Sequence, residues 1–545
     1  MAAALALSLL ALTACSSKPA PSNAGNTQSS TSNSNSATGP KKGGALVFGI
    51  EAEPDVLDPH REGGWITFRV THQIFESLVT EDLSKPATDV SLPPLKGGLA
   101  EKWDVSADGK TYTFYLRKGV KFHDGELFNA QAVDFNIRRV WDKKFPYYDA
   151  RSSIGLHTWQ ALKEIKIVDD STIQLILDRP FEPFLRMIAQ GSMGTASIMS
   201  PAALKKYGQD QVGEHPTGTG PFKFVERVRG QKIVLARNEE YWGQKAYLDR
   251  VIFRPLPEAA SRVTALQTGE ADLIAVPPPD SVDQLKSKGF DVIMGTVPHV
   301  WYLAMNFKDP IISKDVRVRQ AIAMAIDREG MAKNLLKDTA TAAYSIQSPA
   351  NEAFDPAFKD YAYDPDKAKK LLADAGFANG FETTFQVSVD GSGQLIPVPM
   401  AEWIQRDLAK IGIKVKLDTY EWNTYLGKWV GGMEPGIGFN QMSWGFSTPY
   451  FLYIIAHSKY AAPVGLNSGR YNNKAVDDLM DKATQELDPK KAQPLWRQVN
   501  EQLSKDAAFI PIISDKAPHA MTKKVKGFVV PAQEWFDLSL VWLDK

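Results

Sequence analysis

The sequence predicts an α/β protein with more than one domain. Residues 112–116 alternate apolar and polar side chains, which is typical of a strand with one apolar face. Residues 315–336 place Val318 and Ile322 at the spacing of one helix face. Strands and helices of this kind are mixed along 545 residues, which exceeds the usual size of one domain. We therefore expect α/β lobes rather than a barrel or a sandwich.

Turn and cap signals place further elements along the chain. Asp108-Gly109 and Lys118-Gly119 flank the strand at 112–116, so we expect a β-hairpin that continues with a short strand at 120–122. The other expected strands are 45–50, 165–168, 172–177 and 301–307. The other expected helices are 68–78, 129–141, one from Pro365 to a terminating Gly376, and two that begin at Ser200-Pro201 and Asp488-Pro489.

Composition excludes several classes of function. The 63 basic and 63 acidic side chains give a net charge of zero, so nothing predicts attraction to nucleic acid or to an anionic membrane. Cys15 is the single cysteine, which excludes an intrachain disulfide and a Cys-rich zinc site. The eight His form no H-E-x-x-H pair. We expect no cofactor and no bound metal.

No catalytic constellation stands out either. There is no G-x-S-x-G motif, and Gly391-Ser392-Gly393 is interpreted as a turn. Residues 104–109 begin like a calcium loop, but Tyr115 occupies the position where the loop needs a bidentate Glu. The sequence therefore predicts a binding protein and not an enzyme. A secreted hydrolase with scattered carboxylates is the alternative from a different class.

The N-terminal residues have the features of an export signal. Residues 2–14 form an apolar run of 13, shorter than the about 20 residues that span a bilayer. Leu12-Thr13-Ala14-Cys15 resembles a lipobox, so residues 1–15 are interpreted as a lipoprotein signal with Cys15 as the lipidated residue. No Lys or Arg precedes the apolar run. Residues 16–42 are rich in Ser, Asn, Thr, Pro and Gly, which predicts a disordered tether.

The region 98–125 resembles one protein family. It holds Leu99-Ala100-Glu101, Trp103, Ser106, Asp108-Gly109, Tyr112-Thr113-Phe114, Leu116-Arg117, Gly119-Val120 and Phe122-His123-Asp124-Gly125. This run is similar, without gaps, to the signature of the family 5 extracellular solute-binding proteins of ABC importers, the dipeptide, oligopeptide and nickel type. Later landmarks agree in order, namely 237–242, 269–273 and 316–322, so that the resemblance covers about residues 43–545.

The resemblance implies an α/β, two-lobed, hinged fold that is periplasmic-binding-protein-like, of type II and cluster C. The first lobe would have a core of residues 43–92, 212–297 and 519–545, with 93–211 as an extra subdomain. The second lobe would be residues 298–518. A ligand would bind between the lobes and stabilise their closure.

The resemblance also implies a function. The chain would be an extracytoplasmic solute-binding lipoprotein that captures di- or oligopeptides and delivers them to a membrane permease, with separate ATPase subunits supplying the energy. It would be a monomer that contacts the membrane only through its lipid anchor and binds no nucleic acid. We expect it on the outer face of the cell membrane, which is the periplasm in a Gram-negative cell.

Family segments that line the cleft point to candidate ligand-binding residues. These are Glu62, Trp65, Trp301, Tyr302, Trp422, Trp429, Gln441 and Trp444. Peptide-binding members pair the peptide ammonium with an Asp after the Trp that corresponds to Trp444, but no acid stands between Trp444 and Pro449. Gln441 stands where oligopeptide members have a basic residue. An ammonium buried without a counter-charge is costly. Peptides stay the leading class, with Glu62 as a possible counter-charge.

An oligosaccharide of the cello- or xylo-type is the alternative ligand, because aromatic faces stack on sugar rings. A nickel ligand is disfavoured, since no His pair stands at ligand spacing.

Overall fold

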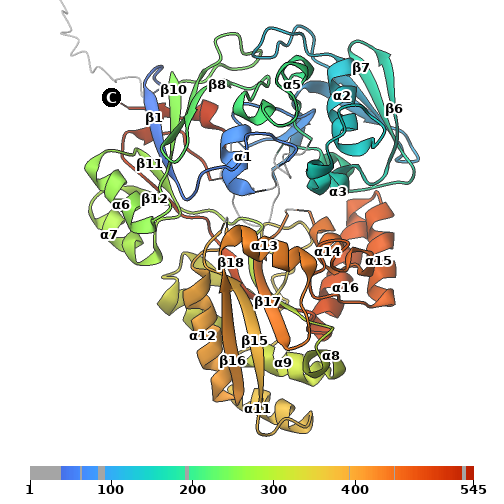
Figure 1. Ribbon diagram of the computed structural model, residues 1–545, viewed down its shortest axis with the longest axis vertical. Helices are drawn as coiled ribbons and strands as arrows, with labels where there is room; N and C mark the ends of the chain where they lie inside the picture. The colour runs from blue at the N-terminus through green and yellow to red at the C-terminus, as the bar shows by residue number, and fades with distance from the viewer. Residues whose placement is uncertain are drawn as a thin grey trace, which may run out of the picture. The chain divides into compact units, whose positions relative to one another are not determined.

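Three β-sheets organise the chain in the computed structural model (Figure 1). The structure describes residues 39–61, 64–83, 93–190, 196–391, 393–446, 448–530 and 535–544. Pro40–Lys545 forms one compact unit. Cys15, the signal 1–15 and nearly all of the tether 16–42 lie outside the described residues. Within the described ranges, no helix has the length and apolar character needed to cross a bilayer.

A seven-stranded mixed sheet draws its strands from distant parts of the sequence. Its order is β12 (Asp291–Ile293), β19 (His519–Met521), β11 (Leu273–Ala275), β1 (Ala45–Ile50), β10 (Arg250–Pro255), β9 (Lys232–Arg237) and β8 (Phe222–Val228). The helices α1 (Trp65–Thr71), α5 (Pro201–Tyr207), α6 (Ala259–Thr268) and α7 (Val282–Ser287) accompany it. Two short ribbons complete this part, β2 (Val79–Glu81) with β3 (Leu95–Gly97) and β20 (Val525–Lys526) with β21 (Trp542–Leu543).

A four-stranded antiparallel sheet has the order β4 (Ala100–Val105), β5 (Thr111–Leu116), β7 (Thr172–Leu177) and β6 (Leu162–Asp169). The helices α2 (Ala130–Trp141), α3 (Leu156–Trp159) and α4 (Phe184–Met187) accompany it. We call the part of the chain built on the seven-stranded and four-stranded sheets lobe I.

A six-stranded mixed sheet forms the rest. Its order is β14 (Ala340–Ala342), β18 (Phe509–Asp515), β13 (Val300–Met305), β17 (Ile437–Trp444), β15 (Phe381–Ser388) and β16 (Ile413–Tyr420). Its helices are α8 (Pro310–Lys314), α9 (Val316–Ala325), α10 (Arg328–Gly330), α11 (Pro365–Asp374), α12 (Pro397–Lys410), α13 (Trp422–Gly431), α14 (Tyr450–Ala456), α15 (Lys474–Gln485) and α16 (Pro489–Lys505). We call this part lobe II.

Successive side chains along the strands of lobe II point to opposite faces of its sheet, and both faces are buried. On β13, Trp301, Leu303 and Met305 join an apolar cluster with α9 and α12, whereas Val300 and Tyr302 join a second cluster with α14 and α16. Figure 1 shows α12 and α14–α16 on opposite sides of the strands. The second cluster continues into the four-stranded sheet of lobe I, where the rings of Phe181 and Tyr450 lie 5.1 Å apart.

The chain passes between the lobes twice, and the two passages are hydrogen-bonded to each other. Residues 294–299 join β12 to β13, and residues 516–518 join β18 to β19. The Gly295 N–H donates to the carbonyl of Lys516 at 2.9 Å, and the Asp515 N–H donates to the carbonyl of His299 at 3.2 Å. We call this pair of segments the hinge ribbon. The boundary of the second lobe expected from the sequence, residues 298–518, remains a proposal, as do the segments expected for the first lobe.

Most expected elements are confirmed, but the hairpin has a different partner strand. The turn at Asp108-Gly109, with Gly109 at φ +67°, joins β5 to the preceding strand β4. Residues 120–122 form no strand, because Lys121 makes only an isolated bridge to Leu127. The prediction of a following strand was therefore wrong. The hairpin turn is instead the Asp108-Gly109 turn between β4 and β5.

Two helices are shorter than expected. The helix expected at 68–78 is α1, which ends at Thr71, and the chain enters β2 at Val79. The helix expected at 315–336 ends at Ala325, because Ile326 is extended, with φ −93° and ψ 118°. Asp327 then caps a new helix by accepting a hydrogen bond from the Gly330 N–H at 2.8 Å. A side chain that caps a helix start thus interrupts an otherwise continuous apolar pattern.

A fully buried ion pair joins the loop after β1 to α2. The guanidinium of Arg139 donates to both carboxylate oxygens of Asp58, at 2.9 and 2.6 Å, and to Asp149 at 3.1 Å. Both Asp58 and Arg139 have no exposed surface. The positive charge and hydrogen bonds of Arg139 outweigh burial and lower the pKa of Asp58.

Replacing Arg139 by Met should destabilise the protein by about 3 kcal/mol, because Asp58 would lose its two short hydrogen bonds to the guanidinium and be left buried with only the Arg61 side chain, 3.7 Å away, as its cation. Urea-induced unfolding followed by circular dichroism measures this change. The matched control is Lys474→Ala, which removes the exposed pair between Lys474 and Asp478 and should not move the midpoint measurably. Equal midpoints for wild type and Arg139→Met would show that the pair does not hold α2 in place.

Candidate functional site

The carboxyl ends of three parallel strands meet at one edge of the lobe II sheet. β15 is parallel to both β16 and β17, so Ser388, Tyr420 and Trp444 end at the same edge. β13 is antiparallel to β17 and begins at this edge, directly after His299. Ligands of open α/β sheets bind beyond the carboxyl ends of the strands. We call this region the carboxyl edge.

Two glycines let the surrounding loops approach His299 closely. A Cβ on Gly393, which has φ +70°, would lie 2.5 Å from the His299 ring nitrogen Nδ1. A Cβ on Gly445 would lie 1.9 Å from the carbonyl oxygen of Pro298. Neither position has space for a side chain, so the loops after β15 and β17 both pack against the start of β13.

His299 is a buried polar side chain at the place where lobe I meets the carboxyl edge. It is 2% exposed, and its ring contacts the indole of Trp65 at the start of α1. In the part of the chain that the structure describes, neither ring nitrogen has a hydrogen-bond partner. Burial, aided by the positive charge of Arg69, lowers the pKa of His299 well below its ordinary value. The neutral imidazole of His299 therefore has one hydrogen-bond donor and one acceptor available for a bound molecule.

Four of the candidate aromatic residues lie in one cluster. Trp444 contacts the rings of Trp429, Phe446 and Phe451, with centroids 6.2, 5.2 and 5.4 Å apart. Tyr302 also contacts Phe451, at 6.4 Å, and Trp422 packs against this cluster. Tyr302 and Trp429 are buried, whereas Trp422 and Trp444 are half-buried. The last two therefore have surface left for a ligand.

The other candidates lie elsewhere. Trp301 and Gln441 are fully buried on the face of the sheet opposite to Tyr302 and Trp444. The Trp301 ring contacts Phe385, and the Gln441 amide donates to the Ser388 hydroxyl at 2.8 Å. Glu62 lies outside the described residues. The ligand contacts of all eight candidates stay predictions.

Sequence reasoning missed several polar residues at the carboxyl edge. The Gln394 amide holds the backbone of Ser443 by two hydrogen bonds, at 3.0 and 3.1 Å. The Asn351 amide donates to the carbonyl of Phe446 at 3.2 Å. His299 could have been suspected, since it directly precedes the strand that contains Trp301. Nothing in the sequence marks Asn351 or Gln394, which long loops bring to the edge.

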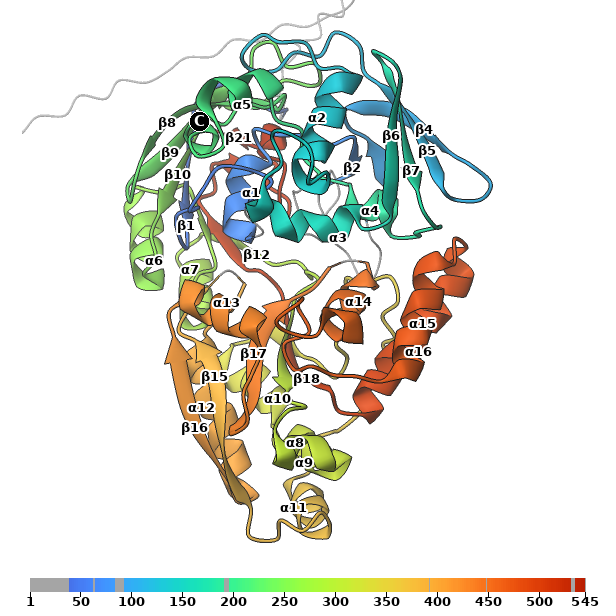
Figure 2. The same cartoon turned by 45° about the vertical axis from the view of Figure 1, so that its right-hand side comes forward.

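Two buried carboxyl groups, one from each lobe, interact electrostatically. Glu182 lies in the segment before α4, where its N–H donates to the carbonyl of Thr484 in α15 at 2.8 Å. Figure 2 shows α15 and α16 beneath this part of lobe I. Burial, and then the negative charge of Glu352 from lobe II, raise the pKa of Glu182 to about 8. Burial also raises the pKa of Glu352. When they are ionised, Glu182 and Glu352 therefore oppose the close approach of lobe I to lobe II.

Within the described ranges, no three His, Cys, Asp or Glu side chains are close enough together to hold a metal ion.

The chain is similar to known binding proteins in both sequence and structure. Residues 94–463 match the model "Bacterial extracellular solute-binding proteins, family 5 Middle". The chain is 32% identical to the dipeptide-binding protein of Escherichia coli K12, over 89% of this chain and 92% of that one. It is 31% identical to heme-binding protein A of Haemophilus influenzae, over 84% and 85%.

The structure is similar to that of the periplasmic binding protein DppA from Helicobacter pylori, solved in complex with the peptide STSA. The TM-score is 0.82 at 31% identity, covering 93% of this chain and 99% of that one. The two-lobed α/β fold is thereby confirmed. The named relatives are binding proteins rather than enzymes.

Replacing Glu182 by Gln should make thermal stability less dependent on pH. The folded pKa of Glu182 is raised above that of the unfolded chain, so its stabilising contribution is present below about pH 4.5 and is lost as pH rises through about 8. The melting temperature of Glu182→Gln minus that of wild type should therefore increase between about pH 5.5 and about pH 8. The exposed Glu101→Gln is the control. If the melting temperatures of Glu182→Gln and wild type change equally with pH, the raised pKa of Glu182 is contradicted.

Proposed function

Because this chain belongs to the bacterial extracellular solute-binding proteins of family 5, we propose that it captures peptides of the di- and oligopeptide class for an ABC importer. The peptide binds between lobe I and the carboxyl edge of lobe II, and closure of the lobes around it creates the form that the permease recognises. Separate ATPase subunits drive the transport. The chain acts as a monomer and performs no chemistry on its ligand.

The unpartnered polar atoms at the carboxyl edge are the observation that carries this proposal. Besides the two ring nitrogens of His299, the buried hydroxyl of Ser443 has no partner in the ranges described. A buried polar group without a partner costs about 1–3 kcal/mol. A peptide backbone supplies both N–H donors and C=O acceptors, which match a neutral imidazole and a hydroxyl. The half-buried rings of Trp422 and Trp444 would contact its side chains.

His299 and Ser443 are poorly suited to bind the charged amino terminus of a peptide. Between Trp444 and Pro449 the sequence has no acid, and His299 is neutral. We therefore propose that backbone contacts carry more of the affinity than the terminal ammonium does. An oligosaccharide is the second candidate ligand, because half-buried indole faces at a polar edge also suit sugar rings.

We further propose that the body is attached to the outer face of the cell membrane through a lipid on Cys15, with residues 16–42 as the tether. The lipobox-like Leu12-Thr13-Ala14-Cys15 after a 13-residue apolar run supports this proposal. A tethered body stays near the permease without itself crossing the membrane.

N-terminal acetylation of the peptide Ser-Thr-Ser-Ala should change its affinity by less than about threefold, because no carboxylate follows Trp444 to bind the ammonium. Titration calorimetry with the two forms measures this. Trp444→Ala should weaken both by about tenfold. Trp403→Ala, a half-buried tryptophan on α12, should not.

Loss of binding on acetylation would show that a carboxylate partner exists. If neither peptide binds but cello- or xylo-oligosaccharides do, the second candidate replaces the first.

Replacing Cys15 by Ala should release the protein from the membrane, because the thiol that would carry the lipid is gone. Cell fractionation followed by immunoblotting compares the mutant with wild type. Ser16→Ala is the control, since it leaves the thiol in place. If Cys15→Ala remains in the membrane fraction like wild type, the anchor is elsewhere.

A further inference from the structure

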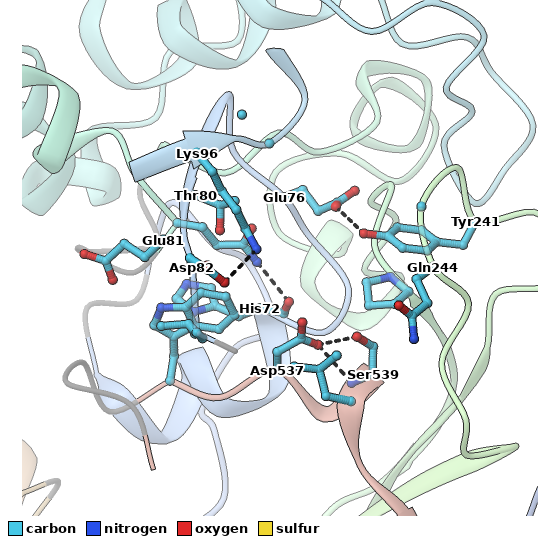
Figure 3. Close-up of a pocket in the computed structure, with 18 of the residues that line it drawn as sticks. His72, Glu76, Thr80, Glu81, Asp82, Lys96, Tyr241, Gln244, Asp537 and Ser539 are labelled. Carbon is cyan, nitrogen blue, oxygen red and sulfur yellow. Dashed lines mark hydrogen bonds and ion pairs between the residues drawn. The ribbon is translucent and has the colours of Figure 1, made fainter. Parts of the chain in front are cut away.

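A hollow lies within lobe I, away from the residues of the carboxyl edge (Figure 3). Its volume is about 450 Å³, which is in the range of small-molecule sites. Residues before and within β2, residues of β3, the loop 241–244 and the C-terminal segment 535–540 line it. None of the described lining residues belongs to lobe II. We call it the lobe I pocket.

His72 presents unsatisfied polar atoms at the wall of this pocket. It is 3% exposed, stacks on Phe68 with ring centroids 5.1 Å apart, and meets the edge of Trp535 at the same distance. Among the described residues, neither ring nitrogen of His72 has a hydrogen-bond partner, and nor does the indole nitrogen of Trp535. Burial lowers the pKa of His72 to about 3, so the imidazole is neutral and offers one donor and one acceptor.

The pocket also holds two carboxylates without a cation. Glu76 accepts hydrogen bonds from Thr219, Tyr241 and Trp242 at 2.7, 2.8 and 2.9 Å, all from uncharged donors. Asp537 accepts from the backbone N–H of Ser539 at 2.9 Å. In the described part of the chain, neither carboxylate has an ion-pair partner. By contrast, the lining residues Glu81 and Asp82 pair with Arg186 at 2.9 Å and with Lys96 at 3.3 Å.

The electrostatics of this pocket favour a cation. Burial is the main cause that raises the pKa of Glu76 to about 7, and the negative charge of Asp537 adds to it. An ammonium placed between the two carboxylates would relieve this repulsion. Tyr241 and Trp535 also line the pocket, and aromatic rings can add favourable contacts for an organic cation.

We propose that the lobe I pocket binds a small primary amine that also carries a hydroxyl or amide group, with the ammonium between Glu76 and Asp537 and the polar group at His72. The ammonium has three donors for the carboxylate oxygens, and a hydroxyl or amide both donates and accepts, as a neutral imidazole requires. This site is independent of the peptide site proposed at the carboxyl edge.

Calorimetric titration of the full chain with 4-amino-1-butanol tests the proposal, with 1,4-butanediol as the uncharged probe of the same length. At about pH 8, where Glu76 is largely ionised, the amine should bind and the diol should not. Asp537→Asn should weaken amine binding by about tenfold. His72→Phe, which keeps the stack on Phe68, should weaken it as well. Lys474→Ala should leave it unchanged.

A second readout covers the case in which a variant fails to fold. In the wild-type chain labelled with ¹⁵N-tryptophan, the indole N–H signal of Trp535, assigned by its loss in Trp535→Phe, should shift on titration with the amine. Absence of both heat and shift overturns the proposal. So does equal binding of the diol, or amine binding that neither Asp537→Asn nor His72→Phe reduces.

Discussion

The hinge ribbon is the constraint on which the rest of the structure depends. The two passages between the lobes are hydrogen-bonded side by side, from Gly295 to Lys516 and from Asp515 to His299. They continue into the paired strands β12 and β19 on one side and β13 and β18 on the other. Two adjacent strands can bend together but cannot separate without losing these bonds. The ribbon thus joins the two lobes by a pair of hydrogen-bonded segments, and it places His299 next to lobe I.

The surroundings of His299 are the main reason for proposing a ligand at the carboxyl edge. Loops after β15 and β17 enclose the imidazole at glycines, and Trp65 contacts it from lobe I. Yet its nitrogens have no partner in the described ranges, so the enclosure leaves polar atoms unsatisfied. A site that is apolar around a few unmet polar groups binds a neutral hydrogen-bonding solute well and a bare charge poorly.

Two opposing effects act between the lobes. Apolar contacts such as Phe181 with Tyr450 continue one hydrophobic cluster across the lobes and favour approach. Burial and the negative charge of Glu352 make ionisation of Glu182 unfavourable between the lobes, and the positive charge of Arg186 only partly offsets this. Under the proposed function, a peptide that satisfies the polar atoms of the carboxyl edge would shift this balance toward a closed form. The lobe I pocket lies outside this balance, since its lining is confined to one lobe.

The sequence by itself located several strands, such as β1, β5 and β7, and several helix starts, because alternation and cap residues such as Asn129, Ser200 and Asp488 act within a few residues. The run at 98–125 determined the family and hence the fold. Long-range packing decided the rest. Alternation placed Trp301 and Tyr302 on opposite faces, but only the helices over each face decided that Trp301 joins a closed core. The same holds for His299, whose surroundings come from Trp65, Gly393 and Gly445, far apart in the chain and adjacent only once both lobes have folded.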